Sequence, residues 1–161
     1  MKTIHWAMIG TGDVTEKKSG PGFYKAKNSV LYGVTNRTLA KAEDYAKRHH
    51  VEKVFASVDD LLADPKVDAV YIATPPGSHK DYALRCAEAG KVCYIEKPIA
   101  LTYNEALEIS ETFKKANVKA FVAYYRRTLP RFTEVKVLLD AGTLGDVRFV
   151  NVAYDRPAVK D

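Results

Sequence analysis

A glutamate and a lysine stand together where an apolar run ends, at Glu96-Lys97-Pro98. The run before them, residues 92–95, is suited to a strand that delivers the lysine to its end. An ammonium group placed there can stabilise a carbonyl or alkoxide oxygen and assist proton transfer. We therefore expect Lys97 to be catalytic, Glu96 to orient its ammonium and Pro98 to fix the turn. Taken alone, the tripeptide would be interpreted as a charged turn.

A glycine-rich segment, Gly10-Thr11-Gly12-Asp13-Val14, follows the first apolar run of the chain. Two glycines let the backbone turn tightly and approach a pyrophosphate, whose charge then meets the N–H groups of the next helix. We interpret the segment as a dinucleotide-binding turn in which Asp13 points away from the phosphates. Thr15 stands at the third small position of the motif, so we expect a looser contact between helix and strand. A plain strand–helix turn is the alternative.

The type of cofactor depends on the residues after the second apolar run, Asn36-Arg37-Thr38. An acidic residue there would bind the ribose 2′-hydroxyl of NAD, whereas an arginine accommodates the 2′-phosphate of NADP. No carboxylate is near, and the Arg37 guanidinium offers a bidentate fork to phosphate. We therefore place Asn36 and Arg37 in the cofactor site and favour NADP, with NAD left open. An exposed arginine in a loop is the plainer interpretation.

A fourth motif, Thr74-Pro75-Pro76, follows the apolar run 69–73. Two prolines make a stiff wall at the carboxyl end of a strand, where ligands bind in folds of this kind. His79, early in the following helix, could donate a hydrogen bond to a ribose or to a substrate. A lone histidine at a helix start is more often a surface residue, so this assignment stays open.

Short apolar runs that alternate with helical patterns must position these groups. Such alternation is typical of βαβ units and predicts a doubly wound parallel Rossmann sheet of the α/β class. Because the carboxyl ends of parallel strands share one edge, Gly12 and Lys97 should meet there. The six expected strands are residues 4–9, 30–35, 54–55, 69–73, 92–95 and 119–124.

Several residues predict where helices begin and break. Ser78 with Asp81, and Thr102 with Glu105, have the spacing of capping boxes. The segment Ser19-Gly20-Pro21-Gly22 should interrupt the first helix, because proline breaks a helix interior. The helices therefore begin close to the ends of the strands that carry the motifs.

The segment after residue 125 has a different pattern. We predict an amphipathic helix over 130–141 and a strand over 147–154. The pattern thus divides the chain into a first domain, residues 1–125, and a further segment, residues 126–161. An unpaired strand needs another edge, so we expect a homo-oligomer, possibly formed through 147–154.

Composition narrows the class of protein. With 161 residues, 47% of them hydrophobic, the chain can bury a core, which argues against disorder and a disulfide scaffold. No apolar run is long enough to span a membrane. The excess of five positive charges is scattered, which favours anionic small molecules over nucleic acid. Cys86 and Cys93 lack the spacing of metal ligands, so we expect reduced thiols and no metal. No signal peptide is evident at the N-terminus, so we expect a cytoplasmic location.

Taken together and in this order, the motifs resemble the Gfo/Idh/MocA family, the group of glucose–fructose oxidoreductase, inositol dehydrogenase and rhizopine catabolism proteins. The resemblance extends from residue 4 to about residue 154. It implies an NAD(P)-dependent oxidoreductase acting on CH–OH groups of sugars, polyols, inositols or related carbonyls. The residues that carry it are Gly10-Thr11-Gly12, Thr74-Pro75-Pro76 with His79, Glu96-Lys97-Pro98 and Ala123-Tyr124-Tyr125-Arg126-Arg127.

The resemblance also implies roles within the site. Lys97 would lie near nicotinamide and substrate with Glu96 beside it, and Tyr125 and Arg126 would face the site. The nicotinamide and ribose side would be lined by Thr74, Pro75, Pro76 and His79. The resemblance further implies that residues 1–125 are the NAD(P)-binding Rossmann domain and that residues 126–161 are a connecting helix and the first strand of a second, substrate-binding α/β domain. The rest of that domain, with the family's catalytic histidine, is missing, so the chain is expected to be an N-terminal piece that is inactive alone. A nucleotide-binding module or regulator without catalysis is the alternative function.

Overall fold

The computed structural model describes residues 2–155, and the chain divides into two units, Met1–Ala123 and Tyr124–Asp161. Each unit is described by itself below. The parts of the expected domains that fall on residue 1 and residues 156–161 lie outside the described residues.

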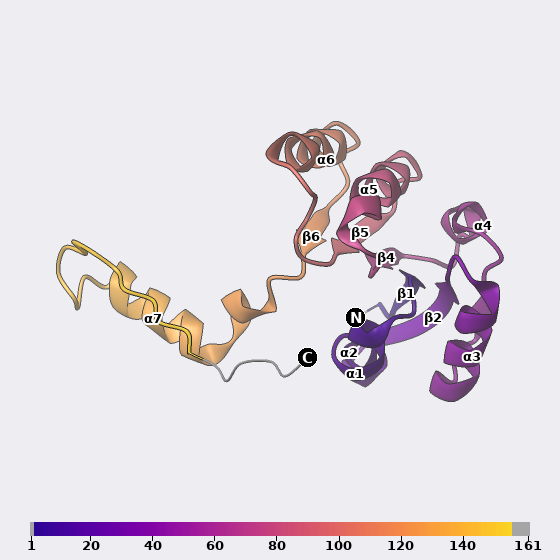
Figure 1. Ribbon diagram of the computed structural model, residues 1–161, viewed down its shortest axis with the longest axis horizontal. Coiled ribbons are helices and arrows are strands. Elements are labelled where there is room, and N and C mark those ends of the chain that lie inside the picture. Colours follow the sequence, from indigo (N-terminus) through magenta and orange to yellow (C-terminus); the bar gives the residue numbers. More distant parts are fainter. Residues whose placement is uncertain (1, 156–161) are drawn as a thin grey trace. The chain divides into compact units, whose positions relative to one another are not determined.

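The first unit contains a six-stranded sheet in the order β3-β2-β1-β4-β5-β6 (Figure 1). All five strand pairs are parallel, and the order reverses direction between β1 and β4. This is the doubly wound α/β sheet predicted from the alternating pattern, and the prediction is confirmed. The strands are β1 Ile4–Ile9, β2 Ser29–Thr35, β3 Lys53–Val54, β4 Ala69–Ile72, β5 Val92–Ile95 and β6 Ala120–Val122.

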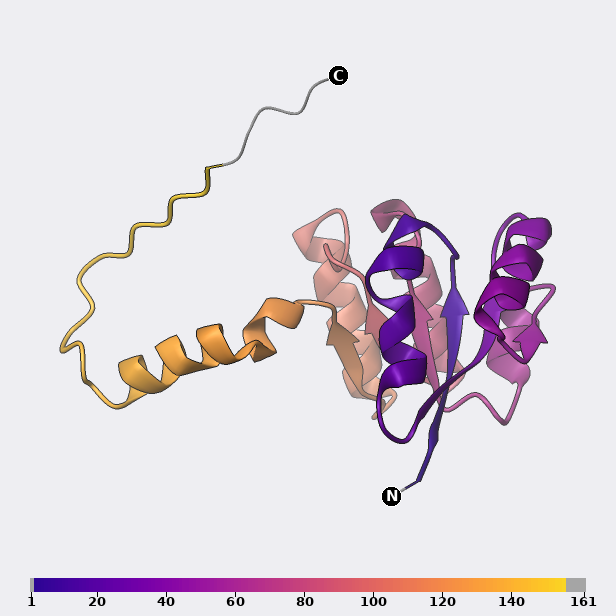
Figure 2. The same ribbon diagram turned by 90° about the horizontal axis from the view of Figure 1, so that it is seen from below.

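Helices cover both faces of this sheet (Figure 2). Phe23 of α2 and Tyr45 of α3 pack with one face, whereas Leu61 of α4, Cys86 of α5 and Phe113 of α6 pack with the other. Burial on both faces explains why β4 is apolar throughout. The helices of this unit are α1 Asp13–Lys17, α2 Gly20–Lys25, α3 Leu39–His49, α4 Val58–Ala63, α5 His79–Glu88 and α6 Tyr103–Lys115, with a 3-10 turn η1 Pro76–Ser78.

The first helix is divided, as predicted, but the break precedes the proline. α1 ends at Lys17, and Gly20-Pro21-Gly22 forms the first turn of α2. Proline is well suited to that position, because its missing N–H would have no helical partner there. A Cβ added to Gly20 would collide with the Thr15 carbonyl oxygen and the Tyr45 hydroxyl. The glycine therefore permits the close packing of the two helices and α3.

The two predicted capping boxes have different outcomes. The Thr102 hydroxyl accepts a hydrogen bond from the Glu105 N–H at 3.3 Å, which confirms this cap, although the Glu105 carboxylate accepts from the Leu101 N–H instead of from Thr102. Ser78 is the N-cap residue of α5, as predicted, but its side chain does not form the predicted capping hydrogen bond. Ser78 belongs to η1, and its hydroxyl lies 2.8 Å from the Thr74 hydroxyl and 2.9 Å from the Pro75 carbonyl oxygen. Pro75 and Pro76 shape this turn, and the Ser78 hydroxyl consequently points toward the preceding residues and not toward the first turn of α5.

The two cysteines, Cys86 of α5 and Cys93 of β5, are free and buried in the core. Burial raises the pKa of the Cys93 thiol well above its ordinary value. Both residues therefore behave as small apolar side chains. None of the helices formed by residues 2–155 combines the length and apolar character needed to cross a membrane.

The second unit contains η2 Tyr125–Thr128 and α7 Pro130–Asp140. The predicted helix over 130–141 is confirmed to within one residue. Residues 147–154, for which a strand was predicted, have no regular secondary structure in the described chain, and pairing of this segment with another chain stays a prediction. An extended segment becomes a strand only when a neighbour pairs with its backbone, and the described residues supply none here. Its apolar side chains are exposed, with Phe149 at 85%.

Candidate cofactor and catalytic site

The motif residues of the first unit leave the sheet at one edge. The last residues of β1, β4 and β5 lie side by side across the sheet: Ile9 pairs with Ile72, and Ile72 pairs with Ile95. Hydrogen bonds extend this alignment by one residue: the Gly10 N–H donates to the Thr35 carbonyl, and the Glu96 N–H donates to the Ile72 carbonyl. The glycine turn and the lysine turn therefore begin at the same edge.

The two glycines of the first turn have different structural roles. Gly10 has φ +97°, and a Cβ added there would lie 2.9 Å from the Ala73 carbonyl oxygen, so any larger residue would disturb the contact with the end of β4. Gly12 precedes α1 with φ −96°, and a Cβ added there meets no atom within 4 Å. The open space beside Gly12 allows a ligand to approach the backbone.

Thr15 occupies the third position of the turn. It is fully buried, and its hydroxyl donates to the Gly12 carbonyl at 2.6 Å. The hydroxyl thus folds back onto its own turn and leaves the methyl group to pack, and the expected looser contact between helix and strand stays a prediction. Asp13 is exposed at the start of α1.

Asn36 joins the end of β2 to the glycine turn. Its side-chain amide donates to the Thr11 hydroxyl at 2.8 Å, and its carbonyl oxygen accepts from the Thr38 N–H at 2.9 Å. Arg37 is exposed beside it and has no hydrogen-bond or ion-pair partner within residues 2–155. An unpaired guanidinium next to the glycine turn is available to a ligand that carries negative charge.

His79 is fully buried at the start of α5 and is not a surface residue. Its Nδ1 lies 2.9 Å from the Pro98 carbonyl oxygen, and its Nε2 lies 2.8 Å from the Thr74 carbonyl oxygen. The hydrogen bond to a ribose or substrate that the sequence suggested does not fit this geometry, because both ring nitrogens face protein carbonyls. His79 instead lies between the Thr74-Pro75-Pro76 wall and the turn that follows Lys97, and a neutral imidazole ring, which has one N–H, donates to one of these two carbonyls and contacts the other.

Lys97 and Glu96 follow β5, but Glu96 does not pair with the Lys97 ammonium. One Glu96 oxygen is 2.7 Å from the Tyr71 hydroxyl, and the other accepts from the Lys97 backbone N–H at 3.1 Å. Within residues 2–155 the ammonium of Lys97 has no partner, and the residue is exposed. The expected orientation of this ammonium by Glu96 is thus corrected: the carboxylate holds the backbone.

Sequence reasoning missed Tyr71 and Ser19, whose hydroxyl oxygens lie 2.8 Å apart. Tyr71 is the one residue with a polar side chain in β4, Ala69–Ile72, and a hydroxyl group within an otherwise apolar strand is the signal that could have found it. Tyr125 and Arg126 belong to η2 of the second unit, where both are exposed. Their participation in the site stays a prediction.

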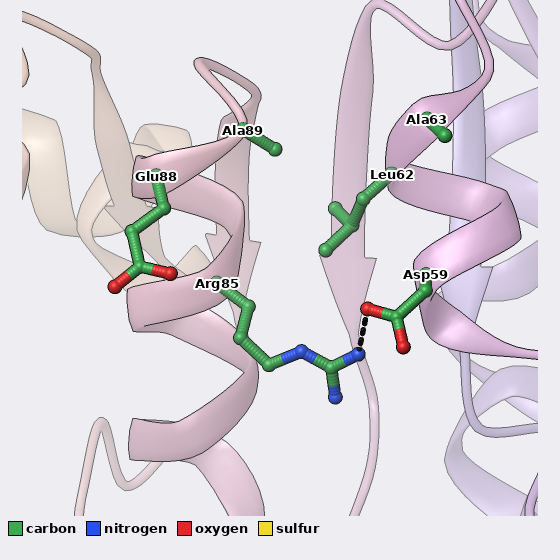
Figure 3. A pocket seen from close by; sticks show the side chains of 6 residues that line it. All are labelled: Asp59, Leu62, Ala63, Arg85, Glu88 and Ala89. Atoms are coloured by element: carbon green, nitrogen blue, oxygen red, sulfur yellow. Dashed lines mark hydrogen bonds and ion pairs between the residues drawn. The ribbon is translucent and has the colours of Figure 1, made fainter.

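A hollow of about 410 Å³ lies on the helix layer, away from this edge. It is open and lies between α4 and α5, and the ion pair of Arg85 with Asp59 crosses it (Figure 3). The hollow is also lined by Ala63 and Ala89, which lie at the carboxyl ends of α4 and α5. These helices run back toward the amino edge of the sheet, so the hollow lies away from the motif residues. Residues 2–155 contain no group of three histidine, cysteine or acidic side chains arranged to hold a metal ion.

Comparison with known proteins identifies the family to which this fold belongs. Residues 4–124 match the family model GFO_IDH_MocA, described as an oxidoreductase family with an NAD-binding Rossmann fold. The chain belongs to this family. The match covers all of the sheet and each motif residue of the first unit, so the resemblance stated from the motifs is confirmed.

Individual relatives agree with the family match. Oxidoreductase P35 of Formosa agariphila is 46% identical over 144 residues, which cover 89% of this chain and 45% of that protein. The scyllo-inositol 2-dehydrogenase (NAD(+)) of Bacillus subtilis is 35% identical over 149 residues, covering 88% of this chain and 42% of that protein.

A solved structure shows the same fold. The scyllo-inositol dehydrogenase of Lactobacillus casei with bound NAD(H) and scyllo-inositol aligns with a TM-score of 0.81 and 28% identity, over 90% of this chain and 43% of that one. The chain thus spans less than half the length of each of these three proteins.

Proposed function

We propose that the complete protein is an NAD(P)-dependent oxidoreductase that transfers a hydride between the nicotinamide cofactor and a CH–OH group or its carbonyl. This proposal is supported by the register of Ile9, Ile72 and Ile95, because it brings the glycine turn and an unpaired lysine to one edge of the sheet. The family match adds that this edge belongs to an NAD-binding oxidoreductase fold.

The described residues suit a dinucleotide. The space beside Gly12 admits a pyrophosphate, whose charge the first N–H groups of α1 would meet. Arg37 is unpaired and would bind a 2′-phosphate, which is why we favour NADP, with NAD as the alternative. Further contacts with the cofactor are proposed for residues of the first unit at the same edge: Gly10, Thr11, Asp13, Val14, Asn36, Thr74, Pro75, Pro76, Glu96 and Pro98. A cofactor contact of Tyr125 and Arg126, which belong to the second unit, stays a prediction from the family resemblance.

The bound cofactor supplies the hydride chemistry, and the chain supplies charge and position. We propose that the Lys97 ammonium lies beside the reacting oxygen, stabilises its negative charge as the alkoxide develops and exchanges a proton with it. Glu96 contributes by holding the Lys97 backbone. His79 contributes by joining the walls on either side of the nicotinamide position.

The substrate class is proposed from the relatives. The Bacillus subtilis relative is a scyllo-inositol 2-dehydrogenase, and the Lactobacillus casei structure contains scyllo-inositol. A sugar, polyol, inositol or related alcohol or carbonyl is therefore the class to test. A cytoplasmic location and a homo-oligomer stay predictions, the latter checked by sedimentation at increasing protein concentration.

The test combines binding with turnover. Fluorescence titration of the protein with NADPH and with NADH measures cofactor affinity, and a screen of inositols and sugars with the complete gene product measures hydride transfer. We expect saturable binding, tighter for NADPH, together with turnover of at least one polyol. Binding without turnover would support the nucleotide-binding regulator instead, and absence of both would refute the proposal.

A further inference from the structure

We infer that Tyr71 is a positioning residue that holds Glu96, and through Glu96 the turn carrying Lys97, in fixed register with the first helices. The inference rests on the proposed function, because it assigns a purpose to Lys97 at this edge. It adds a residue that none of the sequence motifs contains and that acts on Lys97 through Glu96.

The Tyr71 side chain is immobilised inside the sheet–helix interface. It is fully buried, and its ring packs 4.8 Å from the Phe23 ring and 5.6 Å from the Tyr94 ring, measured between centroids. Its hydroxyl lies 2.7 Å from Oε1 of Glu96, which follows β5, and 2.8 Å from Oγ of Ser19, which lies between α1 and α2. A rigid ring thus presents one polar atom to both partners.

The chemistry of the three groups sets the direction of the hydrogen bonds. An ionised carboxylate can only accept, and a tyrosine has one proton to donate. Burial raises the pKa of the Tyr71 hydroxyl well above its ordinary value of 10.0, so the proton stays on the oxygen. Tyr71 therefore donates to Glu96, and the Ser19 hydroxyl can donate to Tyr71 or to the Val14 carbonyl, 3.2 Å away.

Glu96 passes this constraint to the lysine. Its Oε2 accepts from the Lys97 N–H at 3.1 Å while Oε1 is held by Tyr71. The Lys97 ammonium has no partner within the described residues, so in the absence of ligand the backbone is the part of Lys97 that Glu96 holds. A hydrogen bond between charged and neutral groups, made at the edge of the core, is strong enough to fix that backbone.

Ser19 extends the constraint to the glycine turn. It lies in the break between α1 and α2, and its N–H donates to the Val14 carbonyl at 3.0 Å. The close approach of Gly20 to Thr15 keeps this break in place. One hydroxyl in β4 therefore joins the helix that follows the proposed pyrophosphate turn to the turn that carries the proposed catalytic lysine.

Tyr71→Phe removes the hydroxyl alone, and Tyr94→Phe is the matched control. Tyr94 neighbours Tyr71 in the sheet, and its hydroxyl has no hydrogen-bond partner within residues 2–155. The first readout is exchange of the Lys97 backbone N–H, measured by NMR in this chain. We expect exchange at least about fivefold faster in Tyr71→Phe and unchanged in Tyr94→Phe, because the acceptor of that N–H is no longer held.

The second readout is the steady-state kinetics of the complete gene product. Tyr71→Phe should lower kcat about tenfold while KM for the nicotinamide cofactor stays within about twofold, since misplacement of a catalytic group affects the reaction more than ground-state binding. A Glu96→Ala background should abolish the effect of Tyr71→Phe, because the two residues act in one chain of contacts.

The outcomes separate this inference from the proposed function. Unchanged Lys97 exchange with unchanged kcat in Tyr71→Phe would overturn the inference and leave the function standing. A wild-type protein without turnover would refute the function, while the exchange measurement would still decide whether Tyr71 holds the turn. If Tyr71→Phe fails to fold, Glu96→Ala serves as the second variant, because Glu96 is partly exposed where β5 ends. Glu96→Ala must then show faster exchange of the Lys97 N–H. Unchanged exchange in Glu96→Ala would overturn the inference.

Discussion

Ile9 and Ile95 lie in the same row of the sheet, because each is the registered partner of Ile72 between them. Two strand spacings, or about 10 Å, therefore separate the points at which Gly10 and Glu96 leave the sheet. A single bound dinucleotide can contact both turns across that distance. The predictions below test separate parts of this arrangement.

Alanine at the two glycines should separate folding from binding. Gly10→Ala places a Cβ against the Ala73 carbonyl at φ +97°, so we expect a loss of about 1–3 kcal/mol in the free energy of unfolding. Gly12→Ala meets no protein atom and should change stability by less than about 0.5 kcal/mol, yet weaken NADPH binding about tenfold or more. Urea unfolding and fluorescence titration measure the two effects. Equal nucleotide affinity in Gly12→Ala and wild type would contradict the assigned turn.

Lys97→Ala should act on turnover. Removal of the ammonium deprives the reacting oxygen of its charge and proton partner, so we expect kcat of the complete gene product to fall about 100-fold or more, with cofactor affinity little changed. Lys119→Ala is the control, because Lys119 precedes β6 at the amino edge of the sheet. Turnover equal to wild type in Lys97→Ala would remove the catalytic role.

Arg37→Ala should change the choice of cofactor. Loss of a charge-assisted hydrogen bond to the 2′-phosphate is expected to weaken NADPH binding about tenfold, whereas NADH binding should stay constant. Lys25→Ala, at the end of α2, removes the same charge far from the carboxyl edge. Calorimetric titration with both nucleotides measures the ratio. A parallel loss for NADPH and NADH would indicate a general charge effect and argue against a 2′-phosphate site.

Glu16 should make stability depend on pH. Hydrogen bonds from Arg48 and then His49 of α3 lower the pKa of Glu16 from 4.5 to about 2. Its contribution to stability is therefore present above about pH 4.5 and is lost as the pH falls toward 2. Glu16→Gln should be less stable than wild type at pH 7, by a small amount because Arg48 is half exposed, and equally stable near pH 2. A difference that does not vary with pH would contradict this account.

Much of the first unit was predictable because its signals are local and repeated. The apolar runs match β1 and β5 residue for residue, and their parallel order predicted that Gly12 and Lys97 share an edge. Thr102 was identified as a cap because its hydroxyl acts within one turn of helix. These features depend on chain periodicity and on short-range hydrogen bonds, which a single sequence contains.

Other features depended on contacts that the sequence does not contain. Residues 147–154 have strand-like composition, but a strand requires a partner that the described chain does not supply. His79 and Tyr71 acquire their partners from segments 19 and 25 residues away, at Pro98 and Glu96. Ser78 has the letters of a cap, yet the preceding prolines turn its hydroxyl elsewhere. In each case tertiary placement, not local preference, decided the outcome.

The burial of Cys86 and Cys93 has a practical consequence. A thiol reagent in solution cannot reach either sulfur while the sheet and α5 remain packed, and burial keeps the Cys93 thiol protonated and unreactive. Labelling therefore proceeds only as fast as the interface opens. The rate at which thiol reagents label the two native cysteines therefore reports how often this part of the core opens, without an engineered probe.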